Sequence, residues 1–97
     1  MNLEIKSVHY ELEDELKEYI EKKIHRIDYA LDLLVDLQII ISKEKRRFKI
    51  ECNINFRWNY ATHMKVVSYD LKPGIDKLLD KLDNKILKEK EKIQKHQ

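Results

Sequence analysis

Residues 47–57 alternate between apolar and polar side chains almost without exception, and this pattern limits the choice of fold most strongly. One side of the segment carries Phe48, Ile50, Cys52, Ile54 and Phe56. The other side carries Arg47, Lys49, Glu51, Asn53, Asn55 and Arg57. A period of two residues is that of a β-strand, and a strand with one polar side belongs to a sheet with one face in water. The segment therefore predicts an antiparallel sheet that is buried on one face only.

Three further segments, residues 2–6, 35–42 and 60–67, are predicted strands. Residues 35–42 are rich in β-branched side chains, which favour strands over helices. Residues 60–67 form a weaker run, in which we expect Met64 and Val66 to point inward. Together with residues 47–57 they give four strands.

Two segments have the apolar spacing of amphipathic helices. In residues 13–31 the apolar positions are Leu16, Ile20, Ile24, Ile27 and Leu31. The second helix is expected to begin at Asp70, a favourable N-cap, and to run to about residue 93. Its apolar stripe consists of Leu71, Ile75, Leu78, Leu79, Leu82, Ile86 and Ile93. The order β-α-β-β-β-α predicts an α+β fold with two helices on one face of a four-stranded sheet, as in double-stranded-RNA-binding domains.

Composition limits the class of protein. The 97 residues include one Gly and one Pro, so we expect a single domain over residues 1–97, with a frayed tail from about residue 94. No apolar run approaches the ~18 residues of a transmembrane helix, and the N-terminus lacks a signal-peptide pattern. Because Cys52 is the only cysteine, an internal disulfide is excluded. We expect a cytosolic, cytoplasmic protein.

The sequence contains no glycine-rich phosphate loop, no HExxH motif and no CxxC motif. Its histidines, His9, His25, His63 and His96, are scattered along the chain. Cys52 has the inward parity of its strand and His63 the outward parity of the next, so a Cys–His pair is not expected. We interpret Cys52 as a small buried apolar residue. We predict a protein that is not an enzyme and that holds no metal and no cofactor.

Charge is distributed unevenly, although the formal net charge is only +2. Residues 1–42 carry 10 acids and 5 bases, whereas residues 43–97 carry 8 acids and 15 bases. In the second predicted helix lysines recur every three or four residues, at Lys77, Lys81, Lys85, Lys88, Lys92 and Lys95. The acids Asp76, Asp80 and Asp83 lie on a different flank. Segregated lysines suggest a row of phosphate contacts; a lysine-rich surface that is merely solvated stays open as the alternative.

Two smaller basic groups accompany this row. The first, near the end of the first predicted helix, consists of Lys22, Lys23 and Arg26. The second, at the turn between the second and third strands, consists of Lys43, Lys45, Arg46 and Arg47. The first group can join the lysine row if the helices are neighbours, and the second is equally well an ordinary charged turn. For Trp58 and Tyr60, near the next turn, packing is favoured over base stacking.

Several segments, in this order and spacing, resemble the ribosome hibernation promoting factor family, also called the ribosome-associated inhibitor or sigma-54 modulation family. Residues 1–5 are similar to the family's first strand, residues 16–24 to its first helix and residues 40–45 to a strand that ends in a Glu-Lys pattern. Residues 75–82 are the most specific segment. They read IDKLLDKL, similar to the family's AID-x-L-x-DKL, and are followed by Lys85, Lys88, Lys90 and Lys92.

The resemblance implies a short-form, single ribosome-binding domain without the C-terminal dimerisation domain of longer members. Such a protein occupies the decoding groove of the small ribosomal subunit, covers the positions of mRNA and of the A- and P-site tRNAs, and silences idle ribosomes. The implied partner is the small subunit with its 16S rRNA, with no membrane and no small-molecule substrate. We expect a monomer when it is not bound to the ribosome.

The resemblance also indicates where rRNA contacts would lie. The expected residues are Lys22, Lys23, Arg26, Lys77, Lys81, Lys85, Lys88 and Lys92. Candidates for additional contacts are Lys43, Lys45, Arg46 and Arg47. The chain departs from the family pattern in residues 67–75, where Asp70 and Ile75 match but an aromatic residue and a small pair are missing, and at Asn84, which replaces Arg. Two other functions stay open, a general double-stranded-RNA-binding module and a regulator that binds protein.

Overall fold

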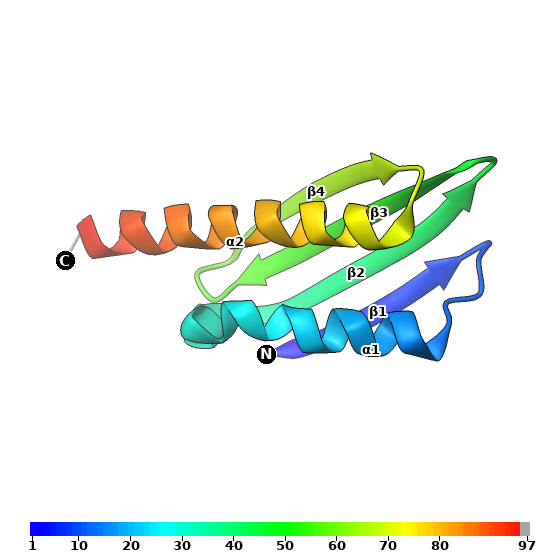
Figure 1. The fold of residues 1–97 in the computed structure, drawn as a ribbon. Coiled ribbons are helices and arrows are strands. Elements are labelled where there is room, and N and C mark those ends of the chain that lie inside the picture. Colours follow the sequence, from blue (N-terminus) through cyan, green and yellow to red (C-terminus); the bar gives the residue numbers. More distant parts are fainter. Residues whose placement is uncertain (96–97) are drawn as a thin grey trace.

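The computed structural model describes residues 1–95 and confirms the predicted order of elements. The strands are β1 (Asn2–Val8), β2 (Leu34–Glu44), β3 (Arg47–Phe56) and β4 (Tyr60–Ser68). The helices are α1 (Asp14–Lys23), the 3-10 helix η1 (Ile24–Leu33) and α2 (Leu71–Lys95). Figure 1 shows the helices on one face of the sheet, which confirms the α+β, β-α-β-β-β-α fold.

The four strands form one sheet in the order β1-β2-β3-β4. β2, β3 and β4 are joined by antiparallel hairpins, but β1 pairs with β2 in parallel. The expectation of a wholly antiparallel sheet is therefore wrong at β1. Alternation along a strand does not distinguish the two pairings, whereas the long crossover through α1 and η1 returns the chain to the end of the sheet where β1 began.

The segment predicted as one helix over residues 13–31 is divided. It is α-helical to Lys23 and a 3-10 helix from Ile24 to Leu33, with a non-helical backbone at Ala30 (φ −129°, ψ 17°). The three-residue period of a 3-10 helix places Ile24, Ile27 and Ala30 on the buried side. α2 extends to Lys95, beyond the expected end near residue 93. Of the tail expected to fray from about residue 94, residues 96 and 97 lie outside the described part of the chain.

The core lies between the helices and one face of the sheet. Cys52 and Ile54 of β3 are fully buried, and so are Ile20 of α1, Ile27 of η1 and Leu82 of α2. The predicted inward parity of β3 is thus confirmed. No helix within residues 1–95 is long and apolar enough to cross a membrane.

α2 packs closely on the sheet at Gly74, the only glycine of the chain. A Cβ at this position would lie 2.5 Å from Ile50 Cδ1 and 2.9 Å from Ser68 Cβ. A glycine inside a helix costs about 1 kcal/mol relative to alanine. Here the absence of a side chain allows the first turn of α2 to approach β3 and the end of β4. This contact fixes which side of α2 faces outward.

Candidate nucleic-acid interface

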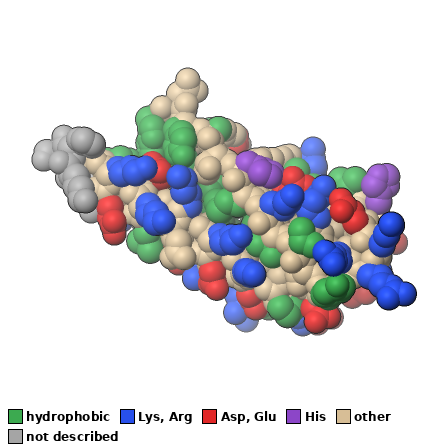
Figure 2. Space-filling view, turned by 90° about the horizontal axis from the view of Figure 1, so that it is seen from above, with side chains coloured by type: hydrophobic (Ala, Val, Ile, Leu, Met, Phe, Trp, Pro, Cys, Tyr) green, Lys and Arg blue, Asp and Glu red, His purple; other side chains and the backbone are tan. Residues whose placement is uncertain are grey.

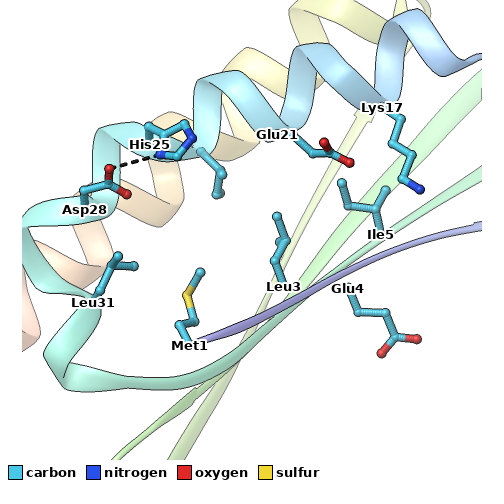
Figure 3. Close-up of a pocket in the computed structure, with 10 residues that line it drawn as sticks. Met1, Leu3, Glu4, Ile5, Lys17, Glu21, His25, Asp28 and Leu31 are labelled. Carbon is cyan, nitrogen blue, oxygen red and sulfur yellow. Dashed lines mark hydrogen bonds and ion pairs between the residues drawn. The ribbon is translucent and has the colours of Figure 1, made fainter.

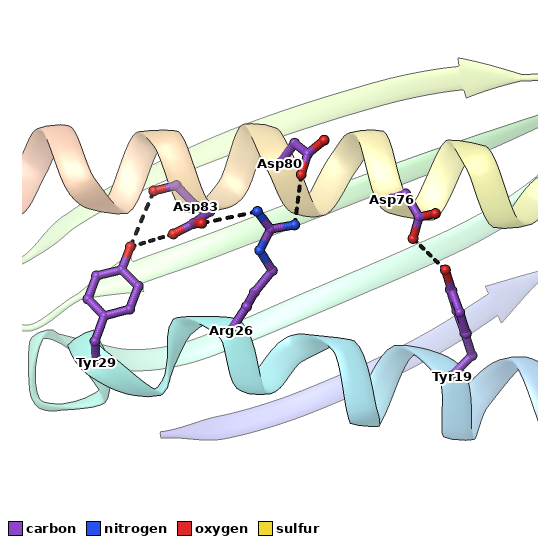
Figure 4. A network of polar contacts seen from close by, with 6 residues as sticks. All are labelled: Tyr19, Arg26, Tyr29, Asp76, Asp80 and Asp83. Carbon is purple, nitrogen blue, oxygen red and sulfur yellow. Dashed lines mark hydrogen bonds and ion pairs between the residues drawn. The ribbon is translucent and has the colours of Figure 1, made fainter.

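The acidic flank of α2, formed by Asp76, Asp80 and Asp83, faces the first helical segment (Figure 4). The Tyr19 hydroxyl donates a hydrogen bond of 2.5 Å to Asp76 Oδ1. The Arg26 guanidinium lies 2.7 Å from Asp80 Oδ1 and 3.1 Å from Asp83 Oδ2. These contacts join α1 and η1 to α2, and the three carboxylates are bound by side chains of the protein itself.

A second tyrosine strengthens this junction. The Tyr29 hydroxyl donates a hydrogen bond of 2.5 Å to Asp83 Oδ1. Burial, together with this hydrogen bond, raises the pKa of Tyr29, and the hydrogen bond to Asp76 raises the pKa of Tyr19. Both hydroxyls therefore stay protonated and act as donors at neutral pH. The hydrogen bond to Asp80, followed by that to Asp83, raises the pKa of Arg26, which stays charged.

The opposite flank of α2 carries the lysines and lies over β4. We call it the basic flank; it consists of Lys77, Lys81, Lys85, Lys88 and Lys92. The Lys81 ammonium donates to the backbone oxygen of Lys65 at 3.5 Å, and the Lys85 ammonium lies 5.4 Å from the centre of the Tyr60 ring. Figure 2 views the β4 and α2 side and shows Lys and Arg side chains along most of its length. The prediction that Asp76, Asp80 and Asp83 lie on a different flank from these lysines is confirmed.

One acid, Glu89, lies within the basic flank and was not singled out from the sequence. Only 5% of its surface is exposed, and its Oε1 lies 3.1 Å from the Lys85 ammonium and 3.3 Å from that of Lys92. Burial raises the pKa of Glu89, but the hydrogen bonds and charges of the two lysines outweigh it, so the pKa lies below its usual value. The position of Glu89 in the apolar stripe, three residues after Ile86, could have identified it.

The lysines of the basic flank therefore differ in how far they are available to a ligand outside the protein. The Lys85 side chain is 28% exposed and is held by Glu89, whereas the Lys92 side chain is 67% exposed. Lys77 and Lys88 are exposed, and neither forms an ion pair with another described side chain. Lys77, Lys88 and Lys92 are thus the lysines best placed to meet a phosphate outside the protein.

The basic residues of α1 and η1 lie apart from the basic flank. The Lys23 ammonium is 5.5 Å from the centre of the Tyr19 ring, and Arg26 is bound to the acidic flank. Lys22 is exposed. Because the acidic flank lies between these residues and the basic flank, the two groups do not form the single patch that the sequence left possible. The charge of Arg26 is matched by Asp80 and Asp83.

The basic group of the β2–β3 hairpin lies at the end of the molecule opposite the C-terminal end of α2 (Figure 1). Lys45 and Arg46 are exposed in the turn. The Lys43 ammonium lies 5.5 Å from the centre of the Phe48 ring, and Arg47 packs on Tyr69. The hairpin group is thus a separate basic surface.

The aromatic residues of the β3–β4 turn pack on one another. The ring centre of Phe56 lies 4.9 Å from that of Trp58 and 5.5 Å from that of Tyr60. Trp58 is still 42% exposed. These contacts favour the interpretation of Trp58 and Tyr60 as packing residues.

A hollow of about 590 Å³ lies between β1 and α1 (Figure 3). Its floor includes Leu3 and Ile5, and its rim includes Glu21 and the His25–Asp28 pair, whose Nδ1 and Oδ2 atoms are 3.0 Å apart. Within the described residues, no group of three or more His, Cys, Asp or Glu side chains is arranged to hold a metal ion.

Residues 3–94 match the family described as "Sigma 54 modulation protein / S30EA ribosomal protein". The chain belongs to this family. It is 32% identical over 96 residues to the ribosome hibernation promoting factor of Azotobacter vinelandii, covering 95% of this chain and 85% of that protein. It is 30% identical over 94 residues to the factor of the same name from Pseudomonas putida, covering 97% of this chain and 91% of that protein.

A solved structure of similar fold is that of a ribosomal subunit interface protein from Coxiella burnetii. The TM-score is 0.84 at 24% sequence identity, with 93% of this chain and 98% of that chain covered. The resemblance inferred from the sequence is confirmed by the family match, and the solved structure supports the fold.

Proposed function

We propose that this protein binds the small ribosomal subunit through its 16S rRNA and silences idle ribosomes. It occupies the decoding groove, where it blocks mRNA and the tRNAs of the A and P sites, and so acts in the cytoplasm. Membership of the family and the names of the relatives support a role at the ribosome. The observation that carries the proposal is the division of charge on α2, with the acidic flank bound to α1 and η1 and the basic flank facing outward.

A lysine row on a long helix suits the sugar-phosphate backbone of folded rRNA. At 1.5 Å per residue, the 15 steps from Lys77 to Lys92 span about 22 Å, enough to meet several phosphates. Phosphate contacts fix the position of a protein on RNA without reading its bases. Phosphate contacts of this kind are sufficient to obstruct a groove, because the shape of the bound protein, rather than base recognition, excludes the other ligands.

Sedimentation with purified ribosomal subunits tests the proposal. The protein should co-sediment with small subunits and less with large subunits, and small subunits that already hold mRNA and tRNA in the A and P sites should retain less of it. Equal retention by empty and filled small subunits would contradict occupation of the decoding groove. Equal binding to naked duplex RNA would instead indicate a general duplex-RNA-binding module, and absence of binding to either subunit would refute the proposal.

A further inference from the structure

We propose that the hollow beside Tyr69 and Arg47 binds an unpaired nucleotide of single-stranded RNA, with the base on the Tyr69 ring and the phosphate beside the β2–β3 turn. This inference rests on the proposed function and deepens it. It adds a contact of a different chemical kind at the end of the molecule opposite the C-terminal end of α2.

Tyr69 is an aromatic side chain that the fold leaves in water. It lies between the end of β4 at Ser68 and the start of α2 at Leu71, and 64% of its surface is exposed. No other large hydrophobic residue in the described part of the chain is as exposed. The ring therefore contributes little to the core and leaves most of its aromatic surface available to a ligand.

Arg47, at the start of β3, holds the Tyr69 ring in place. Its Cζ lies 5.1 Å from the ring centre, and its Nη2 donates a hydrogen bond of 3.2 Å to the Tyr69 hydroxyl. Because these two contacts orient the ring before a ligand arrives, stacking requires little further ordering. The planar guanidinium beside the ring is itself a surface on which bases stack.

The hollow next to this pair is positively charged. It has a volume of about 560 Å³ and is lined by Glu44, Lys45, Arg46, Arg47 and Tyr69. Its single acid, Glu44, lies 3.2 Å from the Lys49 ammonium, which also lies 3.4 Å from Glu51 Oε1. The three cations of the lining outnumber this acid, so the hollow has a net positive charge that attracts a phosphate, and its volume is in the range of small-ligand sites.

The combination of ring and cations favours a single strand over the other polyanions. A base can stack on a protein ring only when it is outside a duplex, because paired bases are covered by their neighbours. An acidic peptide would use the cations of the turn but would gain nothing from an exposed ring. Aromatic surfaces combined with basic side chains are typical of proteins that bind single-stranded nucleic acid.

The test compares two labelled probes of equal charge by fluorescence anisotropy at low salt. One is an eight-nucleotide oligoadenylate, and the other is the same oligomer with every base removed. The wild-type protein should bind the oligoadenylate about tenfold more tightly, the effect expected of one stacked base. Tyr69→Ala should abolish this preference and Tyr69→Phe should retain most of it. Trp58→Ala, which removes an exposed aromatic residue at the other turn, is the matched control and should leave the preference unchanged.

The proposal is overturned if the wild type binds both probes equally, or if folded Tyr69→Ala keeps the preference. It is also overturned if Tyr69→Ala weakens the binding of an eight-base-pair duplex, or of an oligoglutamate of the same charge as the oligoadenylate, as much as it weakens the binding of the oligoadenylate. The proposed function fails separately, by absence of co-sedimentation with small subunits. If the protein does not co-sediment but still prefers oligoadenylate through Tyr69, the nucleotide site is supported and the proposed function is not. If it co-sediments but lacks this preference, only the nucleotide site is refuted.

Discussion

Replacing Gly74 by alanine should destabilise the protein, although alanine is the better helix former by about 1 kcal/mol. The added Cβ would lie 2.5 Å from Ile50 Cδ1 and 2.9 Å from Ser68 Cβ, well inside the ~3.5–4.0 Å optimum for carbon atoms. Ile50 is fully buried, so its side chain has little space to move. Ser68 Cβ is bonded to the backbone and can move only with the end of β4.

Overpacking of this kind costs about 1–3 kcal/mol. With two contacts below 3 Å, we take the upper half of that range. After the gain in helix propensity, the net loss is about 1–2 kcal/mol. In a domain of this size, such a loss lowers Tm by roughly 4–16 °C.

Thermal unfolding followed by far-UV circular dichroism measures this effect. The matched variant is Ile50→Val, which removes Cδ1, the atom nearest to the added Cβ. In the Ile50→Val protein, Gly74→Ala should cost about 1 kcal/mol less than in the wild type, because the closest contact is absent. An unchanged or higher Tm for Gly74→Ala, or additive effects of the two substitutions, would refute the argument that close packing explains the glycine.

Three further predictions concern other parts of the structure. Cys52 should resist thiol reagents in the native protein, because it is fully buried and burial raises its pKa to about 12; rapid labelling without denaturant would contradict the parity of β3. Arg26→Ala should lower the free energy of unfolding in urea by about 1 kcal/mol, because the two ion pairs are partly exposed. Arg26→Lys should recover little of this loss, since one ammonium cannot replace a guanidinium bound to both Asp80 and Asp83; full recovery would argue against the bridge. The pKa of Glu89 is lower in the folded protein than in the unfolded chain, where a glutamate has a pKa of about 4.3, so ionised Glu89 stabilises the fold. This contribution is fully present above that pH and should be lost as the pH falls through the lower pKa of the folded state. Glu89→Gln should therefore reduce the loss of stability between pH 5 and pH 2, measured in urea at each pH.

The strands and α2 could be predicted because their burial follows the residue pattern closely. In β3, burial alternates as the sequence does, and Leu78 and Leu82 of α2 are buried at helical spacing. The change to a 3-10 helix after Lys23 could not be predicted in the same way. Positions three residues apart lie on one side in both helix types, so the step from Ile24 to Ile27 is compatible with either.

The lysine row of the candidate interface could be predicted from spacing alone. The contacts made by the acids of the same helix, Asp83 and Glu89, could not. That Asp83 binds Arg26 and Tyr29 depends on how η1 packs beside α2, and no local pattern encodes this contact. Glu89 has the residue type of a surface position and the spacing of a buried one. The structure resolves this conflict through Lys85 and Lys92, which satisfy its charge.

The salt dependence of binding to purified small ribosomal subunits tests the central claim most directly. The comparison is between Lys88→Ala/Lys92→Ala, on the basic flank, and Lys6→Ala/Lys17→Ala, which removes the same charge near β1 and α1. Each lost phosphate contact should flatten the slope of log affinity against log salt by about 0.7–0.9. The first variant should therefore bind more weakly at moderate salt, with a slope flatter by roughly 1.4–1.8, whereas the second should match the wild type. If the folded Lys88→Ala/Lys92→Ala protein binds as the wild type does at every salt concentration, the basic flank is only a solvated surface.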